Sequence, residues 1–190
     1  LIIHTPIGIV VHSGDFKLDH TPVDGRPTDL SRLAQLGIHG VLLLLSDSTY
    51  AELPGYTPSE RVVGETLDHI MAEAPGRVIV TTFSSLVSRI QQVIDSAAKH
   101  QRRVFVVGRS MSDTVRMALE LGYLKAPSGI LARLDELRGM PHNKIAFVTT
   151  GSQGEPTSAL VRMANRDYRQ LHILRGDTVV ISATPVPGNE

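Results

Sequence analysis

The chain has 190 residues, of which 42% are hydrophobic, so it is long enough and apolar enough to bury a substantial core. Lysine plus arginine number 19, as do aspartate plus glutamate, so any binding of nucleic acid requires a local basic patch or a groove rather than an overall charge. The absence of cysteine excludes disulfides and thiolate metal sites and leaves histidine and carboxylates as metal ligands.

The chain opens with a pattern typical of a β-hairpin. Residues 1–3 and 8–11 are short apolar runs, and Pro6 between them interrupts strand pairing. The first residue is Leu1 rather than methionine, and it lies inside this apolar pattern. We therefore expect the sequence to be a piece of a longer protein.

A helix and a second strand are expected next. Thr28 can cap a helix over residues 29–36, which Gly37 would end. The apolar run that follows predicts a buried strand over residues 40–45. This run is far too short to span a bilayer, so we expect no membrane association.

The rest of the chain alternates helices and strands. A capping box at Thr57 to Glu60 begins a helix that is expected to end at Ala74. The strands expected after it share β-branched apolar runs and cover residues 77–82, 103–107, 144–149 and 178–182. The helices expected between them cover residues 85–99, 112–121, 130–138 and 157–165. This alternation predicts an α/β fold with a mostly parallel sheet and helices on both faces, preceded by a strand–helix–strand tail.

Small polar residues follow each expected strand of this sheet. In open α/β sheets, ligands bind outside the carboxyl ends of the strands, where a helix that begins there offers free backbone N–H groups to phosphate. Ser85, Ser110 and Gly151 are placed for such contacts. For any single loop, ordinary capping or turn formation is the alternative interpretation. Several such loops together favour a phosphate-binding edge.

Asp15 is a candidate metal ligand, because it follows the apolar run that ends at Val11. A dinuclear hydrolytic site uses histidine and carboxylate ligands to hold two ions about 3.5–4 Å apart. The eight histidines are scattered, and no His-x-His-x-Asp-His cluster occurs. A lone aspartate after a strand more often forms a turn or caps a helix. These residues alone therefore cannot complete a metal site.

Six motifs spread over nearly the whole chain are similar to those of one nuclease family: Gly14 to Lys17, Ser46 to Thr49, Phe83 to Gln92, Val107 to Met111, Thr150 to Pro156 and Pro187 to Glu190. Together they resemble the ribonuclease J family, in the β-CASP branch of the metallo-β-lactamase superfamily. The resemblance implies that residues 1–49 are the C-terminal portion of a metallo-β-lactamase domain half. It implies that residues 50–190 form a Rossmann-like β-CASP domain, truncated at its C-terminal end.

The resemblance also implies roles for particular residues. Asp15 matches the metal-bridging aspartate of the superfamily, and Asp47 matches the acidic residue of the first β-CASP motif, which lies beside the catalytic metal site and orders its ligands. The residues expected to contact RNA or its phosphates are Ser85, Arg109, Ser110, Gly151, Ser152 and Glu155.

An enzyme of this family is expected to use two zinc ions to hydrolyse RNA phosphodiester bonds. The resemblance implies 5′-to-3′ exonuclease and endonuclease action on single-stranded RNA, preferably 5′-monophosphorylated, in RNA processing and decay. It further implies a homo-oligomer. The absence of cysteine fits a reducing compartment, so we expect the protein in the cytoplasm. The upstream histidine-rich motif, the third-motif histidine and the downstream β-CASP histidines are absent from these 190 residues. We therefore expect this fragment to be inactive alone.

Three alternatives remain open from the residues. The first is a non-catalytic module that binds nucleic acid or phosphate through Arg89, Arg109 and the strand-exit loops, weakly because the aromatic residues are scattered. The second is a different α/β hydrolase or sugar-phosphate-binding domain, since fold does not fix function. The third is a DNA-processing β-CASP relative. Residues 123–143 could form a surface helix, a partner contact or a long crossover, and the crossover is favoured.

Overall fold

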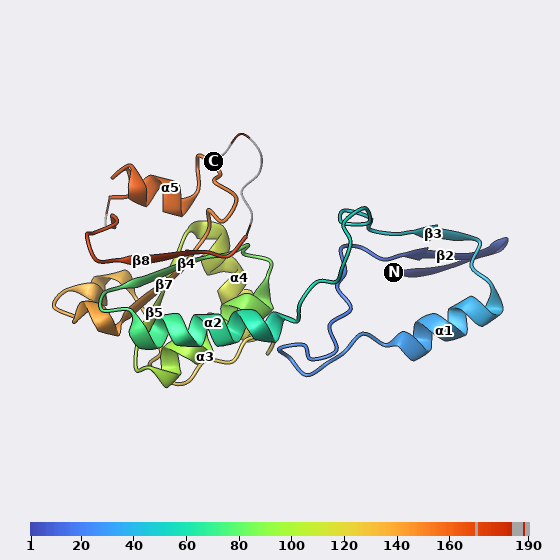
Figure 1. The fold of residues 1–190 in the computed structure, drawn as a ribbon, viewed down its shortest axis with the longest axis horizontal. Coiled ribbons are helices and arrows are strands. Elements are labelled where there is room, and N and C mark those ends of the chain that lie inside the picture. The colour runs from blue at the N-terminus through green and yellow to red at the C-terminus, as the bar shows by residue number, and fades with distance from the viewer. Residues whose placement is uncertain (170, 184–187, 189–190) are drawn as a thin grey trace. The chain divides into compact units, whose positions relative to one another are not determined.

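The computed structural model describes residues 1–169, 171–183 and 188, and its chain divides into two compact units, Leu1–Val62 and Val63–Glu190 (Figure 1). Of the expected motif Pro187 to Glu190, all but Gly188 lies outside the described residues. The division follows Val62, whereas the family resemblance places a domain boundary after residue 49. That family boundary remains a prediction.

The first unit contains a three-stranded sheet in the order β1 (Ile2–Thr5), β2 (Gly8–His12), β3 (Leu43–Leu45), with helix α1 (Leu30–His39) between the last two strands. β1 and β2 pair antiparallel, which confirms the hairpin. β2 and β3 pair in parallel, so the chain forms the expected strand–helix–strand crossover.

The predicted ends of α1 were wrong. Asp29 rather than Thr28 caps the helix, because its carboxylate accepts the N–H of Arg32 at 2.9 Å. The helix continues through Gly37, and the chain leaves it at Gly40, whose φ of +88° is readily adopted by glycine.

The prediction that the strand over residues 40–45 is buried was also wrong. In the described structure the side chains of Leu42 to Leu45 are 45–60% exposed. An apolar run predicts a strand, but it does not reveal whether another layer covers that strand. The first unit therefore presents a continuous apolar strand at the edge of its sheet.

The second unit is built on a five-stranded sheet in which every pairing is parallel, which confirms the predicted α/β fold class. The strand order is β6, β5, β7, β4, β8, and the strands are β4 (Val78–Thr81), β5 (Arg103–Val107), β6 (Leu131–Ala132), β7 (Ile145–Thr149) and β8 (Thr178–Ile181). The helices are α2 (Glu60–Glu73), α3 (Val87–Lys99), α4 (Arg109–Glu120) and α5 (Ala159–Ala164), with short 3-10 helices η1 (Leu134–Leu137) and η2 (His142–Lys144).

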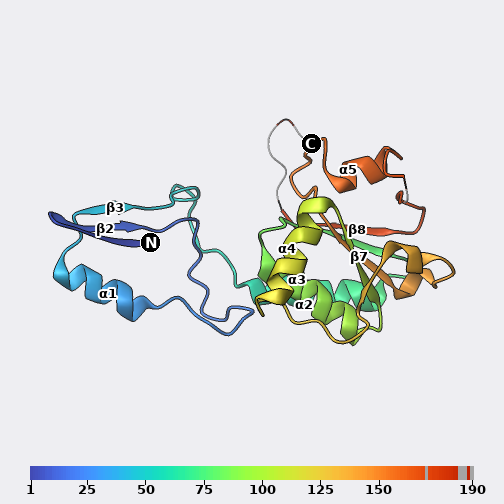
Figure 2. The same cartoon turned by 180° about the vertical axis from the view of Figure 1, so that it is seen from behind.

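Helices cover both faces of this sheet. Successive residues of β4 point to opposite faces: Val78 and Val80 join one apolar cluster and Ile79 joins another. The first cluster includes residues of α2, α3 and α4, and the second includes Ala159 and Met163 of α5. Figures 1 and 2 show α5 on one side of the sheet and α2 and α3 on the other. No helix of the described residues is long and apolar enough to cross a membrane.

Two predicted elements of the second half differ in the structure. The helix expected over residues 130–138 is replaced by β6 and η1, because Leu131 and Ala132 pair with β5 as its edge strand. α2 begins at Glu60 rather than after Thr57. The N–H of Glu60 donates to the carboxylate of Asp19 at 2.8 Å, so the helix start depends on a residue distant in the sequence.

A close backbone approach at Gly76 gives a first prediction. A Cβ at this buried position would lie 2.2 Å from the carbonyl oxygen of Gly176. We expect Gly76→Ala to lower the free energy of unfolding by about 1–3 kcal/mol, because backbone must shift to make room. Urea denaturation followed by circular dichroism measures this. Gly139→Ala, which meets no atom within 4 Å but has a φ of +80°, separates the steric cost from left-handed strain. Unchanged stability of Gly76→Ala would contradict the prediction.

Candidate functional site

The two candidate carboxylates of the first unit follow neighbouring parallel strands. Asp15 lies in the bend after β2 and Asp47 in the turn after β3. Ser13 ties these turns together: its N–H donates to the carbonyl of Leu45 at 2.9 Å, and its Oγ accepts the N–H of Asp47 at 2.9 Å. The strand exits therefore converge in this unit.

Asp47 is held by its own turn. Its Oδ1 accepts the hydroxyl of Thr49 at 2.7 Å and the N–H of Thr49 at 3.0 Å. The bond from the Thr49 hydroxyl, followed by those from the N–H groups of Thr49 and Phe16, holds the pKa of the Asp47 carboxyl below its ordinary value. Asp47 thus carries a negative charge in a fixed orientation beside the turn of Asp15.

Asp15 is exposed and makes no hydrogen bond to the residues that the structure describes. Within the same residues, no group of three or more histidine, cysteine or acidic side chains is placed to hold a metal ion. A catalytic zinc ion takes three protein ligands and a water. The side chains present here therefore do not fit a zinc site by themselves, and Asp15 can supply one ligand.

The second unit brings its strand exits to one edge of the sheet. Ser85 follows β4, Arg109 and Ser110 follow β5, and Gly151 follows β7; these three strands are parallel neighbours. A pocket of about 720 Å³ opens at this edge, and we call it the strand-exit pocket. It is lined by Val106, Gly108, Arg109, Ser110, Ser112, Leu134, Thr150, Thr157, Ala159, Arg162 and Tyr168.

The lining of the strand-exit pocket is basic and rich in hydroxyl groups. It contains two arginines and no acidic residue. Arg109 and Ser110 are exposed in the first turn of α4, where backbone N–H groups have no partner within the helix. Gly108 precedes them with a φ of +106°, and its N-cap position makes no side-chain hydrogen bond. The pocket therefore offers guanidinium, hydroxyl and backbone donors to an anion.

Two lining residues, Arg162 and Tyr168, were missed by the sequence analysis. The guanidinium carbon of Arg162 lies 5.1 Å from the centroid of the Tyr168 ring. They meet because the chain reverses after α5: Arg166 adopts a φ of +63°, and the N–H of Tyr168 donates to the carbonyl of Arg162 at 3.1 Å. No residue spacing in the sequence indicates this reversal, so the pair could not be identified from a motif.

Other predicted contact residues lie outside the lining of this pocket. Ser85 is exposed in the turn before α3, and it does not cap that helix, whose N-cap is Leu86. Gly151 and Ser152 are buried, and the Ser152 hydroxyl has no hydrogen-bond partner among the described residues. The Glu155 carboxylate accepts the N–H of Gln153 at 3.2 Å within its own loop. Roles for these residues in RNA binding remain predictions.

Arg89, which one alternative assigned to nucleic-acid binding, is buried at 6% exposure. Its Nε donates to the Gln92 side chain at 3.0 Å, and its Nη1 donates to the hydroxyl of Ser182. That part of the alternative was wrong, because the bonds to Gln92 and Ser182 hold the guanidinium of Arg89 inside the protein. Arg89 connects α3 to the end of β8.

Comparison with known proteins gives the same family for residues 75–190 and for the chain as a whole. Residues 75–190 match the sequence model of the family described as "Ribonuclease J, beta-CASP domain". The chain is 52% identical over 189 residues to a Ribonuclease J of Synechocystis, with 100% of this chain and 30% of that protein covered. It is 50% identical to a Ribonuclease J of Thermus thermophilus and 47% identical to one of Corynebacterium glutamicum, covering 100% of this chain and 33% and 26% of those proteins. The chain thus spans about a third or less of their length.

Proposed function

Because this chain belongs to the ribonuclease J family, we propose that it is part of a metal-dependent ribonuclease and supplies a surface that binds RNA phosphate. The observation that carries the proposal is the strand-exit pocket, in which Arg109 and Arg162 stand among hydroxyl groups without any carboxylate. A phosphodiester is an anion that accepts hydrogen bonds from all of these donors. The chemistry of the pocket therefore matches the substrate that the names of the relatives indicate.

For the whole protein, we propose hydrolysis of phosphodiester bonds in single-stranded RNA, both inward from a 5′-monophosphorylated end and internally. We further propose a homo-oligomer that works with zinc in the cytoplasm. Asp15 would give one ligand to a zinc site whose other ligands lie outside these residues, and Asp47 would orient its surroundings. The 190 residues alone would therefore bind RNA without cleaving it.

Within the strand-exit pocket, different residues would bind the phosphate and the base. Arg109 would pair with a phosphate at the start of α4, where the free N–H groups add to the attraction. Arg162 is exposed and lies over the ring of the half-buried Tyr168, so together they offer a planar surface against which a base can stack. This arrangement reads no base edge, so binding is expected to tolerate any sequence.

Replacing Arg109 tests this proposal. We expect Arg109→Gln to weaken binding of single-stranded RNA by about tenfold or more, because a hydrogen bond to a charged group is lost. The slope of log Kd against log salt should fall by about 0.7, as expected for one phosphate contact on a single strand. Fluorescence anisotropy with a 2′-O-methyl oligonucleotide, which resists cleavage, measures both.

Arg116→Gln is the matched control for this experiment. Arg116 lies on the same helix, is 71% exposed, pairs with Asp113 and does not line the pocket. It should leave both the affinity and the salt slope unchanged. If Arg109→Gln and Arg116→Gln behave alike, the strand-exit pocket does not bind the RNA backbone.

A further inference from the structure

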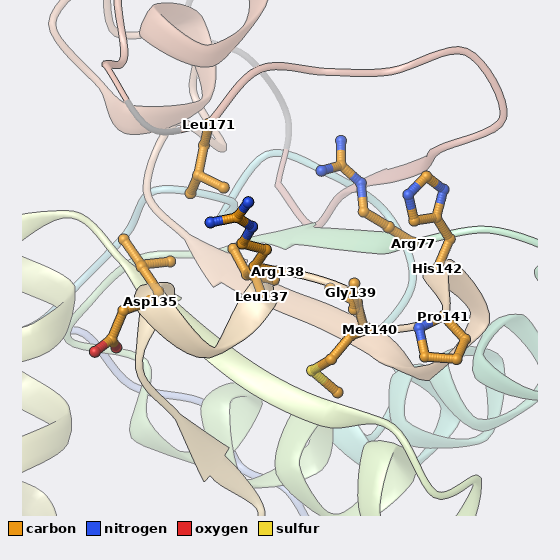
Figure 3. A pocket seen from close by; sticks show the side chains of 11 residues that line it. Arg77, Asp135, Leu137, Arg138, Gly139, Met140, Pro141, His142 and Leu171 are labelled. Carbon is orange, nitrogen blue, oxygen red and sulfur yellow. The ribbon is translucent and has the colours of Figure 1, made fainter.

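A second pocket, of about 560 Å³, lies near the opposite ends of the strands (Figure 3). Arg77, which directly precedes β4, and Ile145, the first residue of β7, both line it. We call it the strand-start pocket. Most of its remaining lining comes from residues 134–142, which connect β6 to β7. This segment contains η1 and the first residue of η2.

Positive charge prevails around the strand-start pocket. Arg138 is exposed, and no hydrogen bond or ion pair to the described residues holds its guanidinium. Arg77 is neutralised by Asp177, whose carboxylate it contacts through Nε at 2.8 Å. The carboxylate of Asp135 lies 3.3 Å from the guanidinium of Arg133, and Figure 3 shows it pointing away from Arg138. Arg138 is thus a cation available to a ligand.

His142 adds a second donor to this pocket. Its side chain is exposed, and Figure 3 shows it with Arg77 on the side of the pocket away from Asp135. A neutral imidazole still donates one N–H, so His142 can bind an anion without being charged. Arg138 and His142 therefore both give the pocket donors for an anion.

Three apolar side chains line the strand-start pocket, and we call them its apolar floor. Leu171 belongs to the apolar cluster under α5, and Leu137 and Met140 pack against that cluster. Its volume falls within the range of about 300–1,000 Å³ typical of small-ligand sites. The combination favours a ligand with an anionic group and a flat, largely apolar body.

Leu134 lines both pockets, so they adjoin along the same face of the sheet. A nucleic-acid strand that occupies the strand-exit pocket could therefore continue across Leu134 towards Arg138. This continuity favours a nucleotide over other organic anions as the occupant.

We propose that the strand-start pocket binds one nucleotide unit, with its phosphate on Arg138 and His142 and its base against the apolar floor. The proposal rests on the proposed function as an RNA-binding surface. The nucleotide comes either from an RNA strand that crosses Leu134 or from a free mononucleotide released by cleavage. An arginine plane and apolar side chains accept any base, so the pocket does not select sequence.

The test compares Arg138→Gln with the unchanged full-length protein. Binding of uridine monophosphate is measured by titration calorimetry, and binding of a 2′-O-methyl dinucleotide and of a longer strand by fluorescence anisotropy. Arg175→Gln is the control, because Arg175 is an exposed arginine of the same unit that lines neither pocket. Arg109→Gln is measured in parallel to report on the strand-exit pocket.

If an RNA strand is the source, Arg138→Gln weakens the binding of the longer strand by at least about tenfold. The affinity for the dinucleotide then stays unchanged. If a free mononucleotide is the source, Arg138→Gln removes most of the binding of uridine monophosphate. An Arg138→Gln protein that binds every probe as the Arg175→Gln control does would overturn the proposal. If Arg138→Gln loses binding and Arg109→Gln does not, the result would instead refute only the proposal that the strand-exit pocket binds RNA.

Discussion

Replacing Asp15 with asparagine in a full-length protein that contains this sequence should lower the rate of RNA cleavage by more than about 100-fold. The physical reason is that residues which only orient metal ligands already cost about 10–100-fold when removed, so a direct ligand should cost more. Degradation of a 5′-monophosphorylated RNA measures the rate, and the zinc content of the purified protein gives an independent readout. Both should fall together.

Two variants sharpen this experiment. Asp47→Asn should lower the rate of RNA cleavage by about 10–100-fold, which is less than the effect of Asp15→Asn. The reason is that Asp47 is bound to Thr49 and would act by orienting its neighbours. Asp24→Asn, at an exposed aspartate of the same unit, should change neither rate nor zinc content. Normal cleavage and full zinc content in Asp15→Asn would refute the assignment of Asp15 as a ligand.

The largest effect on stability is expected from Asp177→Ala. The side chains of Arg77 and Asp177 are 8% and 1% exposed, and Arg77 also donates to the carbonyl of His172 at 2.8 Å. Removing Asp177 leaves a buried guanidinium without its counter-ion, which typically costs about 3–5 kcal/mol. It also removes the acceptor for the N–H of Leu174. Urea denaturation should show the loss directly.

Asp113→Ala provides the matched comparison, because Asp113 pairs with Arg116 on the surface, at 57% and 71% exposure. Its loss should cost less than about 0.5 kcal/mol. The double replacement Arg77→Met with Asp177→Leu should be more stable than Asp177→Ala, since no buried charge is then left alone. A loss below about 1 kcal/mol in Asp177→Ala would contradict the expectation that this replacement leaves a buried charge without its counter-ion.

The central strands of the sheet could be predicted from the sequence because they are buried on both faces. Residues 77–82, 103–107 and 144–149 each contain an apolar run rich in β-branched residues, and the structure places β4, β5 and β7 there. The structure of residues 130–138 could not be predicted correctly, because Leu131 lies in a strand only through its pairing with Val104. Local pattern cannot report such a long-range contact.

Some residues of the candidate site could likewise be predicted from the sequence, and others could not. Arg109 and Ser110 could be found because a strand exit followed by a helix start has a recognisable sequence. Arg162 and Tyr168 depend on the reversal of the chain after α5, and the buried position of Arg89 depends on its bond to Ser182. These contacts exist only once the sheet and helices are packed.

The exposed edge strand β3 has a consequence for the self-association of the chain. Val41 to Leu45 are five consecutive apolar residues without proline or charge, and the last three of them form β3, which is an edge strand of the sheet that the described residues build. Such stretches pair readily with a second copy and nucleate aggregation. A chain that carries this stretch is therefore expected to be prone to self-association for as long as nothing covers the strand.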